Sequence, residues 1–421
     1  MNGGLSMVEM KSGYKMTEVG VIPEDWEVKN VSESCLIKAR IGWQGLKKSE
    51  YMSSGDYLLI TGTDFDNGQV NWKSCAYVSK ARYEQDSNIK IRPQDILISK
   101  DGTIGKVAYL GMIPKAGTLN SGIFVIRAND RKIDQVFLSK IFMSFYFEEF
   151  LNRLVAGSTI NHLYQKDFVK FCFPLPNSEE QVAIAAALSD VDSLISALTK
   201  KIEKKKAIKQ GLMQQLLTGK KRLLGFGDVW DVVQLKRIIS EFIVPMRDKP
   251  TALTGPIPWC RIEDFDGKYL KKSLSNQGVD LNTVSKMNLK IFPVNTLLVS
   301  CSANLGRCAI VKQKLVTNQT FIGLVPSDRI DVEFLYYKMS REDKNLNNMA
   351  TGTTISYLSR EQFENYEILI PSSKAEQTAI ANILSDCDSE IAALEEKRDK
   401  YKEIKQGMMQ QLLTGKIRLI K

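Results

Sequence analysis

The clearest hydrophobic pattern in the chain lies in two segments, where apolar residues alternate at spacings of three and four. The seam residues are Ile184, Leu188, Val191, Ile195 and Leu198 in the first segment, and Ile380, Leu384, Ile391 and Leu394 in the second. This spacing is typical of the a/d seam of a coiled coil. The pattern therefore predicts two long amphipathic helices.

Each predicted helix has signals for its start and its end. The candidate N-caps are Asn177 and Ser373, the capping-box partners three residues on are Glu180 and Glu376, and the left-handed stops are Gly219 and Gly415. About 41 residues at ~1.5 Å each make a rod of about 60 Å. Unlike residues at equivalent seam positions favour one helix packing antiparallel on the other. The alternative is two separate helices, each packed on its own domain.

The two helical segments are copies of one another. Thirty of the 45 positions in 179–223 are identical in 375–419, without a gap and at a constant offset of 196. The segments before each copy correspond weakly, as in Trp26 with Trp230. A repeat of this kind defines the organisation of the fold. We predict an N-terminal tail at 1–19, variable domains at 20–176 and 221–371, and fixed helical segments at 177–220 and 372–421.

Both variable domains show an α+β pattern. Short β-branched runs bounded by turn residues predict strands at 57–61, 95–99 and 123–127, and at 259–262, 297–300 and 321–325. Single helices are predicted over 135–154 and 332–349, where no turn signal interrupts the run. The expected fold class is α+β, with two similar domains separated by two long helices that form an antiparallel intramolecular coiled coil of pseudo-twofold symmetry.

Composition narrows the possible classes of protein. The chain has 421 residues, 43% apolar and 25% charged, with a net charge of +10, which suits two to four globular domains and a polyanionic partner. Its seven cysteines are scattered, as expected of reduced thiols in the cytoplasm. No apolar run approaches the ~20 residues of a membrane span, so no membrane partner is expected.

Motifs for catalysis are missing from the sequence. There is no phosphate loop, and the single histidine, His162, excludes sites built on several histidines. Gly102 to Lys106 is rich in glycine but too short for a phosphate loop, and it is read as a turn at a strand end. We expect a chain that is not itself an enzyme and that holds no metal or other cofactor.

A binding function remains, because polar and basic residues cluster in corresponding loops of both domains. Arg, Lys, Gln and Asn read base edges, whereas hydroxyl groups hold phosphates, so the loops favour nucleic-acid binding. For any one residue the alternative is a solvated surface side chain. The candidate DNA contacts are Arg40, Gln44, Lys47, Lys100, Thr103, Ser158, Asn161 and Gln165 in the first domain, and Arg247, Lys249, Ser302, Asn304, Arg307, Thr353, Tyr357 and Arg360 in the second.

A further basic run lies on the first helix, with six lysines from Lys200 to Lys209 and the single acid Glu203 among them. These lysines could guide a DNA backbone, bind an acidic partner or simply be solvated. The pattern favours none of these interpretations.

Four motifs give the whole chain a resemblance to a known family. They are Gly-Val-Ile-Pro-Glu-Asp-Trp at 20–26, Asp-Ile-Leu-Ile-Ser-Lys-Asp-Gly-Thr-Ile-Gly-Lys at 95–106, Gly-Ser-Thr-Ile at 157–160, and the duplicated Gln-Gln-Leu-Leu-Thr-Gly-Lys at 214–220 and 410–416. In this order the sequence resembles the specificity subunit of type I restriction–modification systems. The second domain departs from the pattern at Cys301 to Gly306, which stands in for the Asp-Gly-Thr-Ile-Gly turn.

The resemblance implies a division of labour. Each variable domain would be a target-recognition domain that reads one half of a bipartite double-stranded DNA target. The helices would set the spacer and dock two modification subunits, which carry S-adenosylmethionine and methylate an adenine in each half. Restriction subunits using ATP and Mg²⁺ would join for cleavage, although the sequence leaves open whether this system has them. A coiled-coil adaptor that binds only protein, and a nuclease that needs no partner, are the alternatives.

Overall fold

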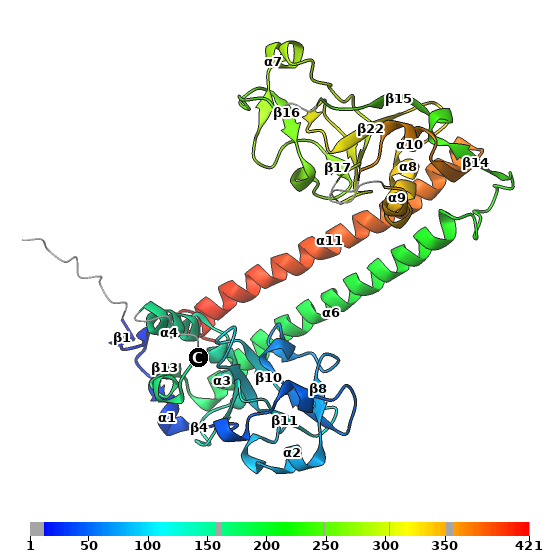
Figure 1. Cartoon of the computed structure of the whole chain (residues 1–421). Helices are drawn as coiled ribbons and strands as arrows, with labels where there is room; N and C mark the ends of the chain where they lie inside the picture. The colour runs from blue at the N-terminus through cyan, green and yellow to red at the C-terminus, as the bar shows by residue number, and fades with distance from the viewer. Residues whose placement is uncertain (1–11, 157–161, 247–248, 303, 351–356, 421) are drawn as a thin grey trace, which may run out of the picture. The chain divides into compact units, whose positions relative to one another are not determined.

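The computed structural model describes residues 12–156, 162–246, 249–302, 304–350 and 357–420 (Figure 1). Contacts divide the chain into a first unit, Met1–Thr199 with Lys397–Lys421, and a second unit, Lys200–Glu396. This division cuts through both long helices, whereas the predicted segments were cut at the helix ends. The reason is that each unit consists of a variable domain together with part of both helices.

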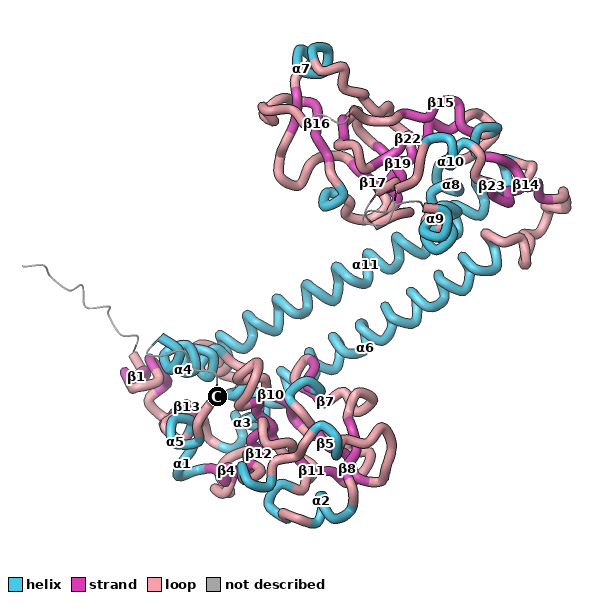
Figure 2. Tube along the Cα trace, viewed as in Figure 1, coloured by secondary structure: helices cyan, strands magenta, loops and turns pink. Residues whose placement is uncertain are grey.

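The long helices are α6, Ser178–Leu216, and α11, Lys374–Leu412. In the first unit Asp192 of α6 pairs with Lys405 of α11 at 2.6 Å, and in the second unit Lys205 of α6 pairs with Glu390 of α11 at 2.7 Å. In the first unit Glu180 of α6 also pairs with Arg418 just after α11, and in the second unit Lys209 also pairs with Asp388. Within each unit, residue numbers therefore fall along α11 as they rise along α6, so the helices are antiparallel. The predicted antiparallel pairing is confirmed (Figure 2).

The seam residues face inward to different degrees. Ile184 and Leu188 join the first unit's core with Met409 and Leu412 of α11, and Ile380 and Leu384 join the second unit's core. Leu198, Ile202 and Ile391 are also buried, whereas Val191, Ile195 and Leu394 are half-buried.

The cap predictions had mixed outcomes. The Asn177 side chain accepts a hydrogen bond from the Glu180 amide at 2.9 Å, and Gly219 and Gly415 have φ angles of 69° and 68°, so this cap and both stops are confirmed. The capping boxes are wrong. The carboxylates of Glu180 and Glu376 are almost fully buried and bind tryptophan and arginine side chains instead.

The first unit is built on a four-stranded sheet of order β10-β9-β12-β4 and a three-stranded sheet of order β11-β5-β8. Its strands are β1 Tyr14–Thr17, β2 Gly20–Pro23, β3 Glu27–Asn30, β4 Cys35–Ala39, β5 Tyr57–Ile60, β6 Phe65–Asp66, β7 Gln69–Val70, β8 Ala76–Val78, β9 Ile96–Ser99, β10 Val107–Tyr109, β11 Gly117–Leu119, β12 Ile123–Ala128 and β13 Cys172–Leu175. Its shorter helices are α1 Val31–Ser34, α2 Lys80–Glu84, α3 Gln135–Phe142, α4 Phe145–Ala156 and α5 Gln165–Phe168. The predicted tail at 1–19 therefore ends inside a hairpin, and its residues 1–11 lie outside the described chain.

The second unit repeats this plan with a five-stranded sheet, β15-β22-β19-β20-β17, and a three-stranded sheet, β18-β16-β21. Its strands are β14 Trp230–Gln234, β15 Ile239–Ile243, β16 Ile257–Cys260, β17 Tyr269–Leu270, β18 Gly278–Val279, β19 Leu297–Ser300, β20 Cys308–Val311, β21 Val316–Thr317, β22 Phe321–Pro326 and β23 Glu367–Pro371. Its shorter helices are α7 Leu281–Lys286, α8 Val332–Met339, α9 Asp343–Met349 and α10 Arg360–Glu364. The six predicted strands and the α+β class are confirmed.

Each helix that was predicted as continuous before a long helix is broken in two. In the first unit α3 ends at Phe142 and α4 begins at Phe145 because the Ser144 hydroxyl accepts a hydrogen bond from the Tyr146 amide. In the second unit α8 and α9 are separated by residues 340–342. A serine cap of this kind gives no hydrophobic signal, so the pattern did not show the break.

Helix α6 also contains an 18-residue stretch with a mean hydropathy of 1.5, apolar and long enough by composition to cross a membrane. The expectation that no such stretch exists was wrong. Ile184 and Leu188 of α6 pack in the first unit's core, and Asp192 bridges Lys140 and Lys405, so the helix has the contacts of a packed core element.

Candidate nucleic-acid interface

In the first unit, three loops meet at one edge of the four-stranded sheet. Phe124 pairs with Ala39 and Ile123 with Ser99, so β4 and β9 end where β12 begins. The Lys100 amide donates to the Gly122 carbonyl at 2.8 Å, and the Leu163 amide donates to the Lys100 carbonyl at 2.8 Å. We call the loops at 40–50, 100–106 and 162–165 edge 1.

The second unit has the same arrangement. Gly323 pairs with Ile243 and Phe321 with Ser300, so β15 and β19 end where β22 begins. The Cys301 carbonyl accepts a hydrogen bond from the Leu358 amide at 2.9 Å. We call the loops at 244–250, 301–307 and 357–360 edge 2. Every candidate DNA contact that lies within the described residues belongs to edge 1 or edge 2.

Most candidates at the edges are accessible. Ser158, Asn161, Arg247 and Thr353 lie outside the described residues. Lys100 and Ser302 are half-buried, and the exposed candidates are Lys47, Thr103, Gln165, Lys249, Asn304, Arg307, Tyr357 and Arg360. The Lys100 ammonium lies 5.1 Å from the centre of the Phe124 ring, and burial lowers the pKa of Lys100. Whether any of these residues contacts DNA stays a prediction.

Arg40 and Gln44 are different, because both are buried. Arg40 is only 2% exposed, and its guanidinium donates to the Leu119 carbonyl at 2.8 Å and to the Thr118 hydroxyl at 3.0 Å. A guanidinium with these internal partners cannot read a base edge unless it leaves them. The burial of both side chains argues against base contact, and we reassign them to supporting the loops of edge 1.

The turn after β9 has a counterpart after β19 despite its different sequence. Gly105 and Gly306 have φ angles of 81° and 85°, and their amides donate to Ser99 and Ser300 at 2.9 and 3.1 Å. A Cβ on Gly105 would lie 2.2 Å from the Leu151 side chain, so only glycine fits there. The departure at Cys301 to Gly306 therefore changes the side chains presented at edge 2 and keeps the backbone of the turn.

Two side chains of edge 1, Tyr164 and His162, were not among the DNA contacts predicted from the sequence. Tyr164 is 55% exposed, with its ring 4.6 Å from that of His162 and 5.5 Å from the Lys166 ammonium. His162 in turn pairs with Asp101. An exposed aromatic ring beside cations is a common feature of nucleic-acid surfaces. The candidates predicted from the sequence include the aromatic Tyr357 of the second domain but omit Tyr164, because loop composition does not show which ring is exposed.

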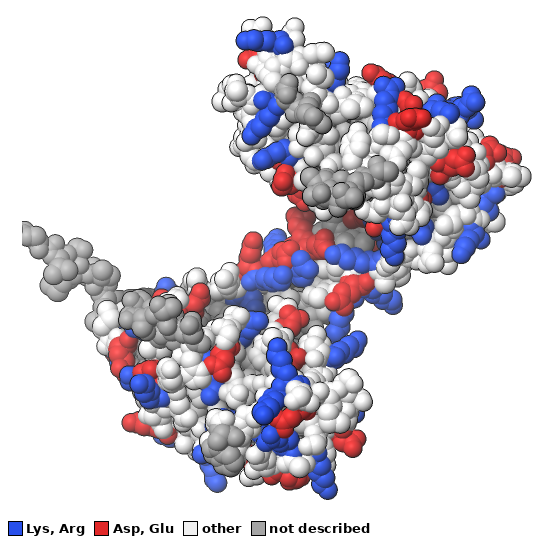
Figure 3. All heavy atoms as spheres, viewed as in Figure 1, with Lys and Arg blue, Asp and Glu red and all other residues white. Residues whose placement is uncertain are grey.

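The basic run on α6 has partners within the chain. Lys205, Lys206 and Lys209 pair with Glu390, Glu395 and Asp388 of α11 at 2.5–2.7 Å. Half of the six lysines are therefore engaged by the second helix. On the face in view, Figure 3 shows lysine and arginine side chains interspersed with acidic ones in both units. The positive surplus is spread over the surface in this view.

The segments that follow the duplicated motif form a pair of clamps, each closed on a buried carboxylate at the start of a long helix. In the first unit, Arg418 makes two hydrogen bonds to the Glu180 carboxylate, at 2.6 and 2.8 Å, and Trp26 adds a third at 3.0 Å. In the second unit, Arg222 binds Glu376 at 2.7 and 2.8 Å, and Trp230 adds a bond at 3.3 Å. Each clamp joins the start of one long helix to the segment that follows the other. The sequence signal for the clamps was an arginine, Arg222 or Arg418, that stands two residues after Gly-Lys in both copies of the repeat.

Groups that could perform chemistry are scarce among the described residues. No three histidine, cysteine or acidic side chains there are placed to hold a metal ion. All seven cysteines are free, and burial raises the pKa of Cys35, Cys75 and Cys260 to about 12, which keeps these thiols protonated and poorly nucleophilic.

Two copies of an α+β unit, each clamped to a shared helix pair and each presenting a polar loop edge, define a duplicated recognition protein. Comparison with known families agrees. The model of the type I restriction modification DNA specificity domain matches residues 23–210 and again residues 227–406. The chain therefore belongs to this family and carries two copies of its domain.

Individual relatives extend the likeness over the whole chain. The chain is 27% identical over 418 residues to the type I restriction enzyme MjaVIII specificity subunit of Methanocaldococcus jannaschii, which covers 94% of each protein. The fold is also that of the type I restriction–modification S subunit from M. genitalium, with a TM-score of 0.61, 16% identity and coverage of 96% of this chain and 99% of that one. A structure solved in a study of assembly of the type I system gives a TM-score of 0.55 at 17% identity, covering 94% and 99%.

Proposed function

We propose that this chain is the DNA sequence-specificity subunit of a type I restriction–modification complex, in which edges 1 and 2 each read one half of a bipartite target. The observation that carries the proposal is the pair of edges themselves. They occupy the same position in two duplicated units, are held by the same backbone bonds, and present different side chains. Equivalent scaffolds with unlike surfaces suit the reading of two unlike half-sites.

The remaining roles in the complex follow from this division. The long helices would fix the distance between half-sites and dock two modification subunits, which supply S-adenosylmethionine and the methyl transfer. This chain would hold no cofactor, would not be catalytic and would act in the cytoplasm. Restriction subunits that use ATP and Mg²⁺ would complete the complex in systems that have them. The family membership supports this assignment.

Methylome sequencing tests the proposal. Cells that carry this chain with its modification subunit should show methyladenine at one bipartite motif, with an adenine modified in each half. Cells with the modification subunit alone are the control and should lack that motif. If the pair produces no bipartite motif, the proposal is wrong, and a mobility shift on random DNA then separates a protein-only adaptor from a DNA-binding protein. Cleavage of DNA by the purified chain alone would support the nuclease alternative.

A further inference from the structure

One carboxylate in each unit connects a recognition domain to both long helices. In the first unit, Asp192 of α6 accepts a hydrogen bond from Lys140 of α3 at 2.7 Å and pairs with Lys405 of α11 at 2.6 Å. In the second unit, Asp388 of α11 accepts bonds from Tyr337 of α8 and Lys209 of α6, both at 2.5 Å. We call these the Asp192 junction and the Asp388 junction.

The two junctions occupy equivalent places in the repeat. Asp192 and Asp388 are separated by the offset of 196, and so are Lys209 and Lys405. In the first unit the aspartate lies on α6 and the lysine on α11, whereas in the second unit the aspartate lies on α11 and the lysine on α6. The helices are interchanged because each domain is followed by a different long helix. The residue from the domain differs, with lysine at 140 and tyrosine at 337. What is repeated is a three-element contact centred on one carboxylate.

The contacts at each junction are directional and mostly shielded from water. The side chains of Lys140, Asp192 and Lys405 are 8%, 27% and 22% exposed. Burial acts to raise the pKa of Asp192, but hydrogen bonds from Lys140 and Lys405 outweigh it and lower the pKa below its ordinary value. Burial and the neighbouring Asp388 raise the pKa of Tyr337, so its hydroxyl remains a donor. The Asp192 carboxylate therefore stays charged at neutral pH, and the Tyr337 hydroxyl stays a donor.

The position of each junction along its helix is informative. Leu188 and Leu384, four residues before Asp192 and Asp388, are fully buried in the domain cores. Residues four apart share a helix face, so each carboxylate is one turn beyond the core. Apolar packing is not directional and tolerates small rotations, whereas short bonds among three elements fit only one orientation. The junctions are placed to select the orientation of the domain on the helix pair.

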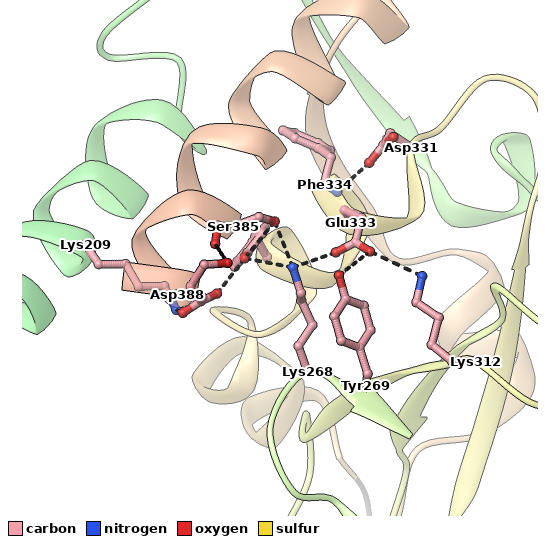
Figure 4. A network of polar contacts seen from close by, with 11 residues as sticks. Lys209, Lys268, Tyr269, Lys312, Asp331, Glu333, Phe334, Ser385 and Asp388 are labelled. Carbon is pink, nitrogen blue, oxygen red and sulfur yellow. Dashed lines mark hydrogen bonds and ion pairs between the residues drawn. The ribbon is translucent and has the colours of Figure 1, made fainter. Parts of the chain in front are cut away.

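The Asp388 junction is the more extensive of the two (Figure 4). Lys268, just before β17, donates to the Ser385 hydroxyl at 2.8 Å and to the Tyr337 hydroxyl at 3.1 Å, and it pairs with Glu333 of α8 at 2.7 Å. Tyr269 donates to the same glutamate at 2.8 Å. Alignment of the Asp-Phe-Asp triplets at 64–66 and 264–266 places Gly68 at the position of Lys268, so the Asp192 junction has no counterpart of this lysine.

We propose that Asp192 and Asp388 are positioning residues, which hold each recognition domain in one orientation on the helix pair and thereby restrict the spacer lengths that the protein accepts. The inference rests on the proposed function. A domain that can rotate on its helices presents its edge over a range of positions. Loss of a junction therefore relaxes the spacer and leaves the half-site sequences unchanged, because the loops of the edges are untouched.

The test uses the full chain with its modification subunit in cells that carry a plasmid library. The two half-sites found by methylome sequencing are kept, and the spacer is varied one base pair at a time. Asp388→Asn and Asp192→Asn should methylate the neighbouring spacer lengths about tenfold more than the wild type does, a change of ~1.4 kcal/mol in relative transition-state binding. The matched control is Glu390→Gln, because Glu390 pairs with Lys205 between the same helices and its side chain is 45% exposed.

Two results would contradict the inference that Asp192 and Asp388 are positioning residues. Wild-type spacer selectivity in both asparagine variants overturns the inference. An equal loss of methylation at every spacer length, together with a lower melting temperature, also overturns it, because such a result would show that the aspartates only stabilise the fold. If Asp388→Asn does not fold, Tyr337→Phe decides, because it removes one hydroxyl and should relax the spacer more weakly. If the wild-type chain produces no bipartite methylation motif, the proposed function itself is wrong. That result is obtained before any variant is made, so the two failures can be told apart.

Discussion

At the scale of single residues, chemical type alone did not separate an accessible candidate for DNA contact from a side chain that is buried inside the domain. Arg40 and Gln165 were both predicted as contacts because arginine and glutamine read bases. The structure buries Arg40 beneath edge 1 and exposes Gln165 at the start of α5. Their positions differ because Arg40 directly follows β4 and its guanidinium reaches the Leu119 carbonyl and the Thr118 hydroxyl inside the domain. Burial depends on tertiary packing, so a loop composition could not show it.

We expect the two residues to respond differently to mutation. Arg40→Ala leaves the Leu119 carbonyl and the Thr118 hydroxyl without their donor, and it should lower the free energy of unfolding by about 1–3 kcal/mol. Gln165→Ala removes an exposed side chain and should change stability by less than about 0.5 kcal/mol. Denaturant unfolding of the purified chain measures both. Equal stability of the two variants would contradict the assigned role of Arg40.

At the scale of elements, the sequence predicted what depends on local periodicity and missed what depends on distant partners. The a/d spacing predicted both long helices, because seam residues such as Leu188 and Leu384 recur with the helical period. Unlike residues at equivalent seam positions predicted the antiparallel pairing. The capping-box role of Glu180 was wrong, since its true partner, Arg418, is 238 residues away in the sequence. No local pattern distinguishes a glutamate that caps a helix from one that binds a distant arginine.

The clamps should be among the most sensitive elements of the fold. Arg418→Met leaves the fully buried Glu180 carboxylate without its cation, and because the Arg418 side chain is itself 32% exposed, the expected loss of stability is about 1–3 kcal/mol. The double variant with Glu180→Gln removes the unpaired charge and should recover part of this loss. Lys402→Met is the control, because the ion pair of Lys402 with Asp399 is exposed. Thermal melting of the three variants tests the assignment, and equal melting temperatures for the first and the control would refute it.

At the scale of the whole molecule, duplication explains why one chain can serve a bipartite target. Each unit contains one edge, one clamp and one junction, built at equivalent positions of the repeat. The edges differ in sequence, whereas the helices that join the units are nearly the same in both copies. Under the proposed function, half-site choice and spacer length would therefore be encoded in different parts of the chain and could change independently.

This separation predicts the effect of shortening both helices. Deleting one heptad from the middle of α6 and the facing heptad of α11 removes about 10 Å at ~1.5 Å per residue, while the seam turns by only ~20°. At ~3.4 Å per base pair, the spacer should become shorter by up to about three base pairs, with both half-sites unchanged. Methylome sequencing reads the motif directly. Deleting five residues instead turns the seam by about 140°, which breaks its packing and should abolish methylation. A change in either half-site sequence after the heptad deletion would show that the helices take part in base reading and do not act as a ruler.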